Sequence, residues 1–185
     1  SARLRAERGR NLHVDRRELA WSRRKNDLLI YGQRHINAAF TYTRAGGNRF
    51  NDESRGAWYC SWDVLTSVAE VGFHRTRELG FIGIYRDTAR YVELLADFIG
   101  DYPDITDEPG HRALHPDPAI GYPEGQVFAK GLQRDGYRGL IYGSVRQPGE
   151  RCLVAFEPSA IQNVRPGASW EMRWEGTADY ALCGV

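Results

Sequence analysis

Hydrophobic and polar positions alternate with several different periods along this chain, and each period predicts one kind of element. Runs that are apolar, or that alternate every second residue, are typical of strands and lie at residues 28–31, 58–60, 140–145, 151–156 and 170–175. Two glycines followed by an asparagine, at residues 46–48, predict a tight turn. Most of the predicted strands therefore lie in the last third of the chain.

Helical periodicity is concentrated in the middle of the chain. Valines at helical spacing predict a helix that begins after Ser61 or Asp63, both good capping residues, and stops at Gly80. Apolar residues three or four positions apart predict a second helix over about residues 87–99. A short helix is expected over residues 124–134.

The segment between these helices has the composition of a loop. Residues 101–125 hold five of the eight prolines together with His111 and His115. Long loops in compact domains are often binding elements or lids. Helices in the middle and strands toward the end predict one mixed α+β domain over residues 27–185, preceded by a basic segment at residues 1–26.

Composition sets limits on the class of protein. A chain of 185 residues, 42% hydrophobic, is long enough for one sizeable core. It has no run of eighteen apolar residues and no apolar stretch behind a basic start, so we expect a soluble cytoplasmic protein. Its three cysteines, Cys60, Cys152 and Cys183, lack zinc-site spacing and are expected to be buried thiols.

The net charge of +1 hides an uneven distribution. Residues 1–25 carry nine basic and three acidic side chains, a balance of +6. Such a segment is either a solvated helix face or flexible arm, or an arm that contacts an acidic partner or nucleic acid. No aromatic residue interleaves with these arginines before Trp21, which argues against direct nucleic-acid binding.

Four residues stand out as candidate chemistry: Arg49, Tyr59, Glu70 and Ser144. An arginine fork, an aromatic ring, a carboxylate and a hydroxyl together suit a dinucleotide ligand. Each also has an ordinary structural explanation, such as a surface ion pair for Arg49 or a core position for Tyr59. Glu70 is the most informative, because it lies among apolar residues of the predicted helix and carboxylates are seldom buried without a partner.

Two further observations limit the chemistry. His74 follows Glu70 by one helical turn, so both side chains can face one cleft, or they can form a surface ion pair. One such pair offers too few ligands for a metal site, and none is predicted. Ser144 lacks the G-x-S-x-G context of a hydrolase nucleophile, so a hydrogen-bonding role suits it better.

The order and spacing of these motifs resemble the RES domain family, named for its arginine, glutamate and serine. The resemblance covers about residues 28–165 and rests on segments 46–51, 58–60, 69–74, 139–146 and 152–158. One departure is Asn48, inserted between the glycine pair and the arginine. The basic amino-terminal segment is another.

The resemblance implies a fold related to ADP-ribosyltransferases, consumption of NAD⁺, and a bacterial toxin paired with an Xre-like helical antitoxin. By this resemblance Arg49, Tyr59, Glu70 and Ser144 are the catalytic and NAD⁺-binding positions. An early arginine of the family corresponds either to Arg34 or to Arg44; the latter and His74 are further candidates for NAD⁺ binding.

The chemistry of NAD⁺ cleavage fits this set of side chains. Breaking the nicotinamide–ribose bond develops positive charge on the ribose, which Glu70 can stabilise. Arg49 would hold the pyrophosphate, Tyr59 would stack on nicotinamide, and Ser144 would bond the ribose or carboxamide. Water, phosphate or a protein side chain can accept the ADP-ribose. The alternative is a non-catalytic interaction module that binds an acidic partner or nucleic acid through its basic segment.

Overall fold

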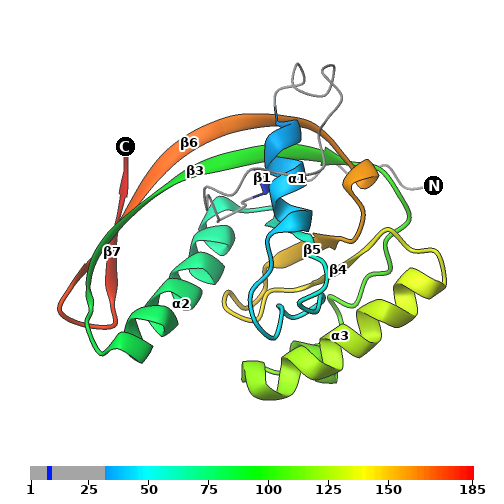
Figure 1. The fold of residues 1–185 in the computed structure, drawn as a ribbon, viewed down its shortest axis with the longest axis horizontal. Coiled ribbons are helices and arrows are strands. Elements are labelled where there is room, and N and C mark those ends of the chain that lie inside the picture. The colour runs from blue at the N-terminus through cyan, green and yellow to red at the C-terminus, as the bar shows by residue number, and fades with distance from the viewer. Residues whose placement is uncertain (1–7, 10–31) are drawn as a thin grey trace.

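The computed structural model describes residues 8–9 and 32–185 of this mixed α+β domain (Figure 1). Its helices are α1 (Gln33–Thr41), α2 (Val64–Ile82) and α3 (Pro118–Arg134), with 3-10 turns η2 (Arg112–Leu114) and η3 (Pro158–Ala160). Its strands are β1 (Arg8–Gly9), β2 (Trp58–Ser61), β3 (Arg86–Phe98), β4 (Gly139–Gly143), β5 (Arg151–Ala155), β6 (Ile161–Glu175) and β7 (Tyr180–Gly184). The strand expected at residues 28–31 and most of the basic segment lie outside the described residues.

All strand pairings are antiparallel, in the order β4-β5-β2-β1-β3-β6-β7. Strand β1 joins two groups of three strands, because Gly9 pairs with Cys60 on one side and with Leu94 on the other. Strands β3 and β6 form a long curved ribbon over α2, whereas α3 lies on the opposite side of the molecule, beyond β4 and β5 (Figure 1).

Residues 87–99 are not a helix: they lie within and just after strand β3. The pairing of β3 with β6 shifts register between Val92 and Leu94. This irregularity changes the phase of the alternation, so Tyr91 and Leu94 face inward three positions apart, as they would on a helix. Pairing with a distant strand therefore overrides the local period.

The helix that carries Glu70 forms as predicted, with small changes at its ends. Asp63 is the cap, and its carboxylate accepts hydrogen bonds from the amides of Leu65 and Thr66. The helix continues past Gly80 to Ile82 and is capped by Gly83, which has a positive φ of 73°. Asp63, which the sequence offered beside Ser61, thus sets the start of α2.

Helix α3 is longer than the predicted helix at residues 124–134. It begins at Pro118, which occupies the first turn, where proline loses no hydrogen bond, and Asp117 caps it. Only residues 101–117 of the expected loop precede this helix, and they include the 3-10 turn η2. Two prolines of the expected loop, Pro118 and Pro123, therefore lie within the helix.

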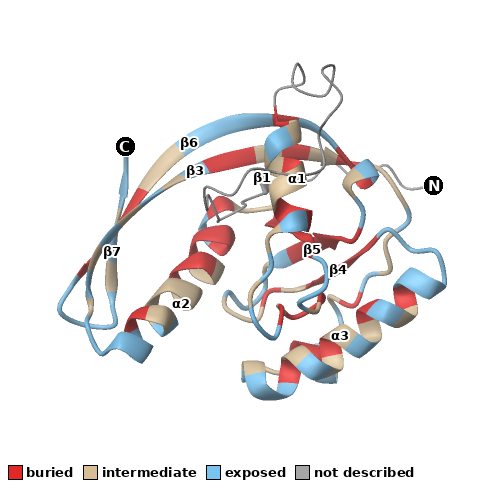
Figure 2. Cartoon of the chain, viewed as in Figure 1, coloured by how far each residue is buried: buried red, intermediate tan, exposed pale blue. Residues whose placement is uncertain are grey.

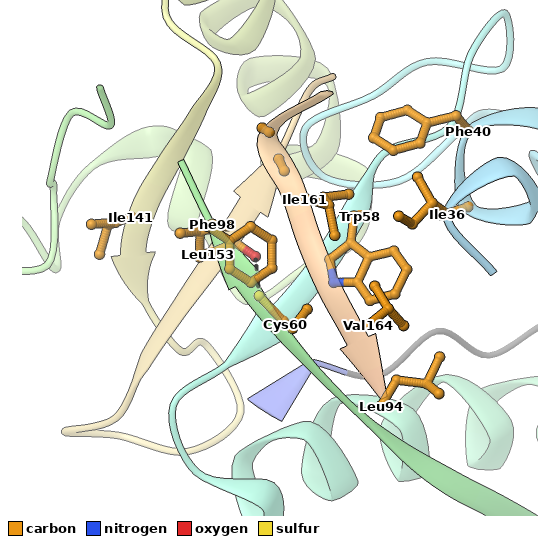
Figure 3. Packing of buried hydrophobic residues seen from close by; sticks show 14 residues of the cluster. Ile36, Phe40, Trp58, Cys60, Leu94, Phe98, Ile141, Leu153, Ile161 and Val164 are labelled. Atoms are coloured by element: carbon orange, nitrogen blue, oxygen red, sulfur yellow. Dashed lines mark hydrogen bonds between the residues drawn. The ribbon is translucent and has the colours of Figure 1, made fainter. Parts of the chain in front are cut away.

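Strands β2 and β5 lie between two of the clusters of buried hydrophobic residues, because alternate residues face opposite sides. Trp58 and Leu153 pack with Phe98 on the side of α1 (Figure 3), and Cys60 approaches the Leu153 carbonyl there. Val154 and the partly buried Tyr59 face the cluster under α3. Burial is concentrated on β2, β4, β5 and the first half of α2 (Figure 2).

Cys60 and Cys152 are buried free thiols, as expected, but Cys183 on β7 is exposed. No helix within the described part of the chain combines the length and the apolar character needed to cross a bilayer.

Candidate functional site

A pocket of about 170 Å³ lies where α2, β2, α3 and the segment after α1 meet. Its polar lining residues are Tyr42, Thr43, Arg44, Asn48, Arg49, Tyr59, Ser61, Ser67, Glu70, His74, Tyr122, Tyr142 and Arg146. The structure therefore brings together five of the predicted residues. Ser144 lies behind this lining, and Arg34 is exposed on α1.

Glu70 is half-buried in the wall of the pocket. Its Oε1 accepts a hydrogen bond of 3.1 Å from the Ser144 hydroxyl. Burial raises the pKa of Glu70, while the bond from Ser144 and the charges of Arg146 and Arg49 oppose this rise. The carboxylate thus accepts a hydrogen bond from Ser144 and lies within the electrostatic influence of two arginines.

Ser144 follows strand β4 and has no hydrogen-bonding capacity directed into the pocket. Its single proton goes to Glu70, and its oxygen accepts from the amides of Arg146 at 3.3 Å and Gln147 at 3.0 Å. A hydroxyl has one donor and two acceptor positions, so all three are used. The geometry makes Ser144 a support for the carboxylate rather than a contact for a ligand.

Arg49 is held by the chain on both sides. Its Nη1 donates to the carbonyls of Ala113 at 2.6 Å and His115 at 2.9 Å, and its guanidinium lies 5.4 Å from the ring centre of Tyr122. Only 8% of Arg49 is exposed. Its Nη1 is committed to the protein, which leaves Nε and Nη2 for other contacts.

The predicted turn before Arg49 requires its glycines. Gly46 and Gly47 have positive φ values of 75° and 70°, and a Cβ on Gly47 would lie 2.2 Å from the Asn51 carbonyl. The inserted Asn48 closes the turn, because its amide donates to the same carbonyl at 2.8 Å. The insertion therefore belongs to the structure that presents the guanidinium.

Tyr59 holds this same segment through its hydroxyl. The hydroxyl accepts from the Phe50 amide at 2.9 Å and donates to Asn51 Oδ1 at 2.8 Å. Burial raises the pKa of Tyr59 well above its ordinary value, so the phenol is neutral. Because the polar tip is occupied, only the ring is available to the pocket.

His74 lies one turn beyond Glu70, and its Nε2 is 3.5 Å from the Tyr122 hydroxyl. Burial, followed by the charges of Arg44 and Arg146, lowers the pKa of His74 to about 3. Its Nδ1 is buried and has no hydrogen-bond partner among the described residues. The imidazole is therefore neutral at ordinary pH.

Arg146 and Tyr122 are among the lining residues that the sequence did not single out. Arg146 Nη2 donates to the Pro116 carbonyl at 2.8 Å, and its guanidinium lies 3.5 Å from the ring centre of Phe73. Its position two residues after Ser144 was a signal, because its amide donates to the Ser144 hydroxyl oxygen at 3.3 Å. Nothing in the local pattern around Tyr122 marks it.

Cations outnumber anions in the pocket. Arg44, Arg49 and Arg146 face one carboxylate, Glu70, and the neutral His74. The Arg44 side chain forms no hydrogen bond or ion pair with any residue from 32 to 185. Over the same residues, no three His, Cys, Asp or Glu side chains are grouped so that they could hold a metal ion. The pocket suits an anionic organic ligand.

The sequence model of the RES domain family matches residues 28–175 of this chain. The chain belongs to the RES domain family. The match runs beyond residue 165, where the resemblance was expected to end, and includes all of β6. No curated protein matches the chain. The family assignment thus covers every element of this RES domain that contributes to the pocket.

Proposed function

We propose that this RES domain consumes NAD⁺ by cleaving the nicotinamide–ribose bond and passing ADP-ribose to water, phosphate or a protein side chain. One observation carries the proposal: a carboxylate fixed by a serine shares a pocket with three arginines and aromatic rings. Among the described residues that line the pocket, Glu70 is the only one with an acidic side chain. In this proposal Glu70 is therefore the catalytic anion.

The reaction places separate demands on the two ends of the substrate. When the bond between ribose C1′ and the nicotinamide nitrogen breaks, both electrons stay with nitrogen and neutral nicotinamide leaves. Positive charge then grows on the ribose, and the Glu70 carboxylate stabilises it. A lone pair of the acceptor forms the new bond at C1′, and the acceptor loses its proton to Glu70 or solvent.

The arginines bind the pyrophosphate. Arg49 presents Nε and Nη2, and Arg44 adds a charge that no described residue pairs. The rings of Tyr59 and Tyr122 form apolar walls for a flat heterocycle. The neutral His74 contributes a ring nitrogen as a hydrogen-bonding group without adding to the positive charge. In this proposal Ser144 acts through Glu70.

The direct test is NAD⁺ loss by the purified chain, followed by chromatography. Free nicotinamide should appear in step with NAD⁺ loss, and products formed with and without inorganic phosphate and a cell extract identify the acceptor. Release of no nicotinamide under any of these conditions would exclude the proposed reaction. An interaction module acting through residues 1–26 gains no support here, because that segment lies almost wholly outside the described residues.

We further propose that the chain is a toxin of the cytoplasm with an ADP-ribosyltransferase-like fold, restrained by an Xre-like helical antitoxin. Unrestrained NAD⁺ consumption harms any host, which is the reason to expect a partner. A segment of that partner should cover the pocket near Arg49 and Glu70. Co-expression with the product of the neighbouring gene tests this: a purified complex as active as the free chain would contradict occlusion.

The basic segment is a weaker point of contact for the same partner. Exposed charges are screened over about 8 Å at physiological ionic strength, so any contribution of residues 1–25 should fade as salt is added. Deleting residues 1–25 should therefore lower the affinity of the complex only at low salt. Unchanged affinity at low salt would remove the segment from the interface.

A further inference from the structure

We infer that the main chain of residues 113–116 positions both Arg49 and Arg146 for a pyrophosphate, and that Gly121 on α3 makes this arrangement possible. The inference rests on the proposed function and concerns how that site obtains its affinity. Neither the family match nor the sequence motifs point to this segment.

Three carbonyls within four consecutive residues face the two guanidinium groups. The carbonyls of Ala113 and His115 accept from Arg49 Nη1 at 2.6 and 2.9 Å. The carbonyl of Pro116 accepts from Arg146 Nη2 at 2.8 Å. One short stretch of backbone therefore fixes the direction of two of the three pocket arginines, Arg49 and Arg146.

Carbonyl partners have an electrostatic consequence. A carboxylate that held these arginines would neutralise them, whereas a carbonyl accepts the hydrogen bond and leaves the unit charge in place. The charges of Arg49 and Arg146 therefore remain available to an anionic ligand. The arginines are oriented without losing their charge.

The segment itself is fixed at both ends. The amide of Leu114 donates to the His111 carbonyl at 2.8 Å, and the amide of His115 donates to the Arg112 carbonyl at 3.2 Å. Asp117 then caps α3 directly after the last carbonyl. The carbonyls belong to a hydrogen-bonded turn that leads straight into a helix.

Aromatic rings restrict the guanidinium groups further. Arg146 lies 3.5 Å from the ring centre of Phe73, and Arg49 lies 5.4 Å from that of Tyr122. Each guanidinium thus has a ring beside it in addition to its carbonyl bonds. Ligand binding then costs little further side-chain ordering, which favours affinity.

Gly121 lies where this arrangement is tightest. A Cβ at this position would lie 2.6 Å from Arg49 Nη1 and 2.5 Å from the His115 carbonyl oxygen. A methyl group therefore has to displace the guanidinium, the carbonyl, or both. Gly131 on the same helix provides a matched control, because a Cβ there meets nothing within 4 Å.

The test compares Gly121→Ala with Gly131→Ala in the full chain. Affinity is measured by calorimetry for ADP-ribose, which carries the pyrophosphate, and for nicotinamide riboside, which lacks it. Because losing one hydrogen bond between an arginine and a phosphate costs about tenfold or more in affinity, Gly121→Ala should weaken ADP-ribose binding at least about tenfold. Binding of nicotinamide riboside should change less than about twofold, and Gly131→Ala should bind both ligands as the wild type does.

Three outcomes overturn the inference: unchanged ADP-ribose affinity in Gly121→Ala, equal weakening of both ligands, or the same loss in Gly131→Ala. In each case wild-type protein that still binds ADP-ribose and consumes NAD⁺ leaves the proposed function standing. Wild-type protein that neither binds ADP-ribose nor consumes NAD⁺ refutes the proposed function itself.

A measurement on the wild type covers the case in which Gly121→Ala fails to fold. Hydrogen exchange of the amides of Leu114 and His115 is followed with and without saturating ADP-ribose. If the carbonyls support the ligand-binding arginines, the bound state should slow this exchange. Unchanged or faster exchange would mean that the ligand competes with the carbonyls, and the inference would be wrong.

Discussion

The hydroxyl of Ser144 donates a hydrogen bond of 3.1 Å to Glu70 Oε1, although 74 positions separate the two residues in the chain. The serine oxygen also accepts two backbone amides, from Arg146 and Gln147, and these fix its direction. The turn that follows β4 therefore fixes the orientation of the Glu70 carboxylate through Ser144. A bond to the ionised form also lowers the pKa of Glu70 against the effect of burial.

Removing the Ser144 hydroxyl should impair catalysis, because it supports the Glu70 carboxylate. Ser144→Ala should lower kcat for NAD⁺ about tenfold with a smaller change in KM, because the transition state depends on the anion more than substrate binding does. The acidic limb of the pH–rate profile should also move to higher pH, because the bond that favours ionised Glu70 is gone.

Ser159→Ala is the matched control, since Ser159 donates to Glu157 at the exposed surface. It should leave both kcat and the profile unchanged. A Ser144→Ala enzyme that loses affinity but keeps kcat would instead assign the serine to the substrate.

The charge of Glu70 can be tested separately from its shape. Glu70→Gln retains the side-chain volume and one oxygen for the Ser144 bond but loses the anion. NAD⁺ consumption should fall by about two orders of magnitude or more, as expected when one transition-state electrostatic group is lost. Nicotinamide release by the folded variant is the measurement, and turnover equal to the wild type would refute a catalytic carboxylate.

The same substitution should affect stability in the opposite sense. The folded protein holds Glu70 with a raised pKa, so it binds this proton more tightly than the unfolded chain does. The stabilisation is complete below the unfolded pKa and is lost as pH rises through the folded value. Glu70→Gln should therefore unfold at a higher urea concentration than wild type at pH 7, with a smaller gain at pH 4. An equal gain in the urea midpoint at both pH values would contradict a raised pKa of Glu70 in the folded protein.

His74 should make the domain sensitive to acid. Its folded pKa is about 3 because of burial and the charges of Arg44, Arg146, Arg77 and Arg49, whereas an exposed histidine has 6.5. The unfolded chain takes up the proton first, so stability is lost as pH falls from about 6.5 toward 3. Urea midpoints between pH 7 and pH 4 should fall more steeply for wild type than for His74→Gln. Parallel slopes would show that His74 titrates normally.

Arg34 and Arg44, the two candidates for the additional arginine of the family, should differ in their effect on ligand binding. Arg44 lines the pocket, while Arg34 is exposed on α1 and lies outside it. Arg44→Ala should weaken ADP-ribose binding by about five- to tenfold, with a loss that shrinks at high salt as the lost ion pair is screened. Arg34→Ala should bind like wild type in the same titration. Equal losses in the two variants would indicate a general charge effect instead of a contact.

Local signals were sufficient for several parts of this molecule. The helix that carries Glu70 follows from its valine spacing and from Asp63, because a cap and an apolar stripe act within a few residues. The glycine pair before Arg49 likewise encodes its own turn. Strands β4 and β5 are short apolar runs, and their predicted positions differ from the observed ones by one or two residues.

The sequence by itself thus determined the capped helix, the turn and the order of the motifs, since short-range sterics and hydrogen bonds specify each of them. Tertiary structure decided what those motifs do. It turned residues 87–98 into a strand by pairing them with β6, and it directed the Ser144 hydroxyl to Glu70 instead of a ligand. It also brought Arg146 beside Arg49 through carbonyls far away in the chain. These contacts depend on which surfaces pack together in three dimensions, and no local period of the sequence records that.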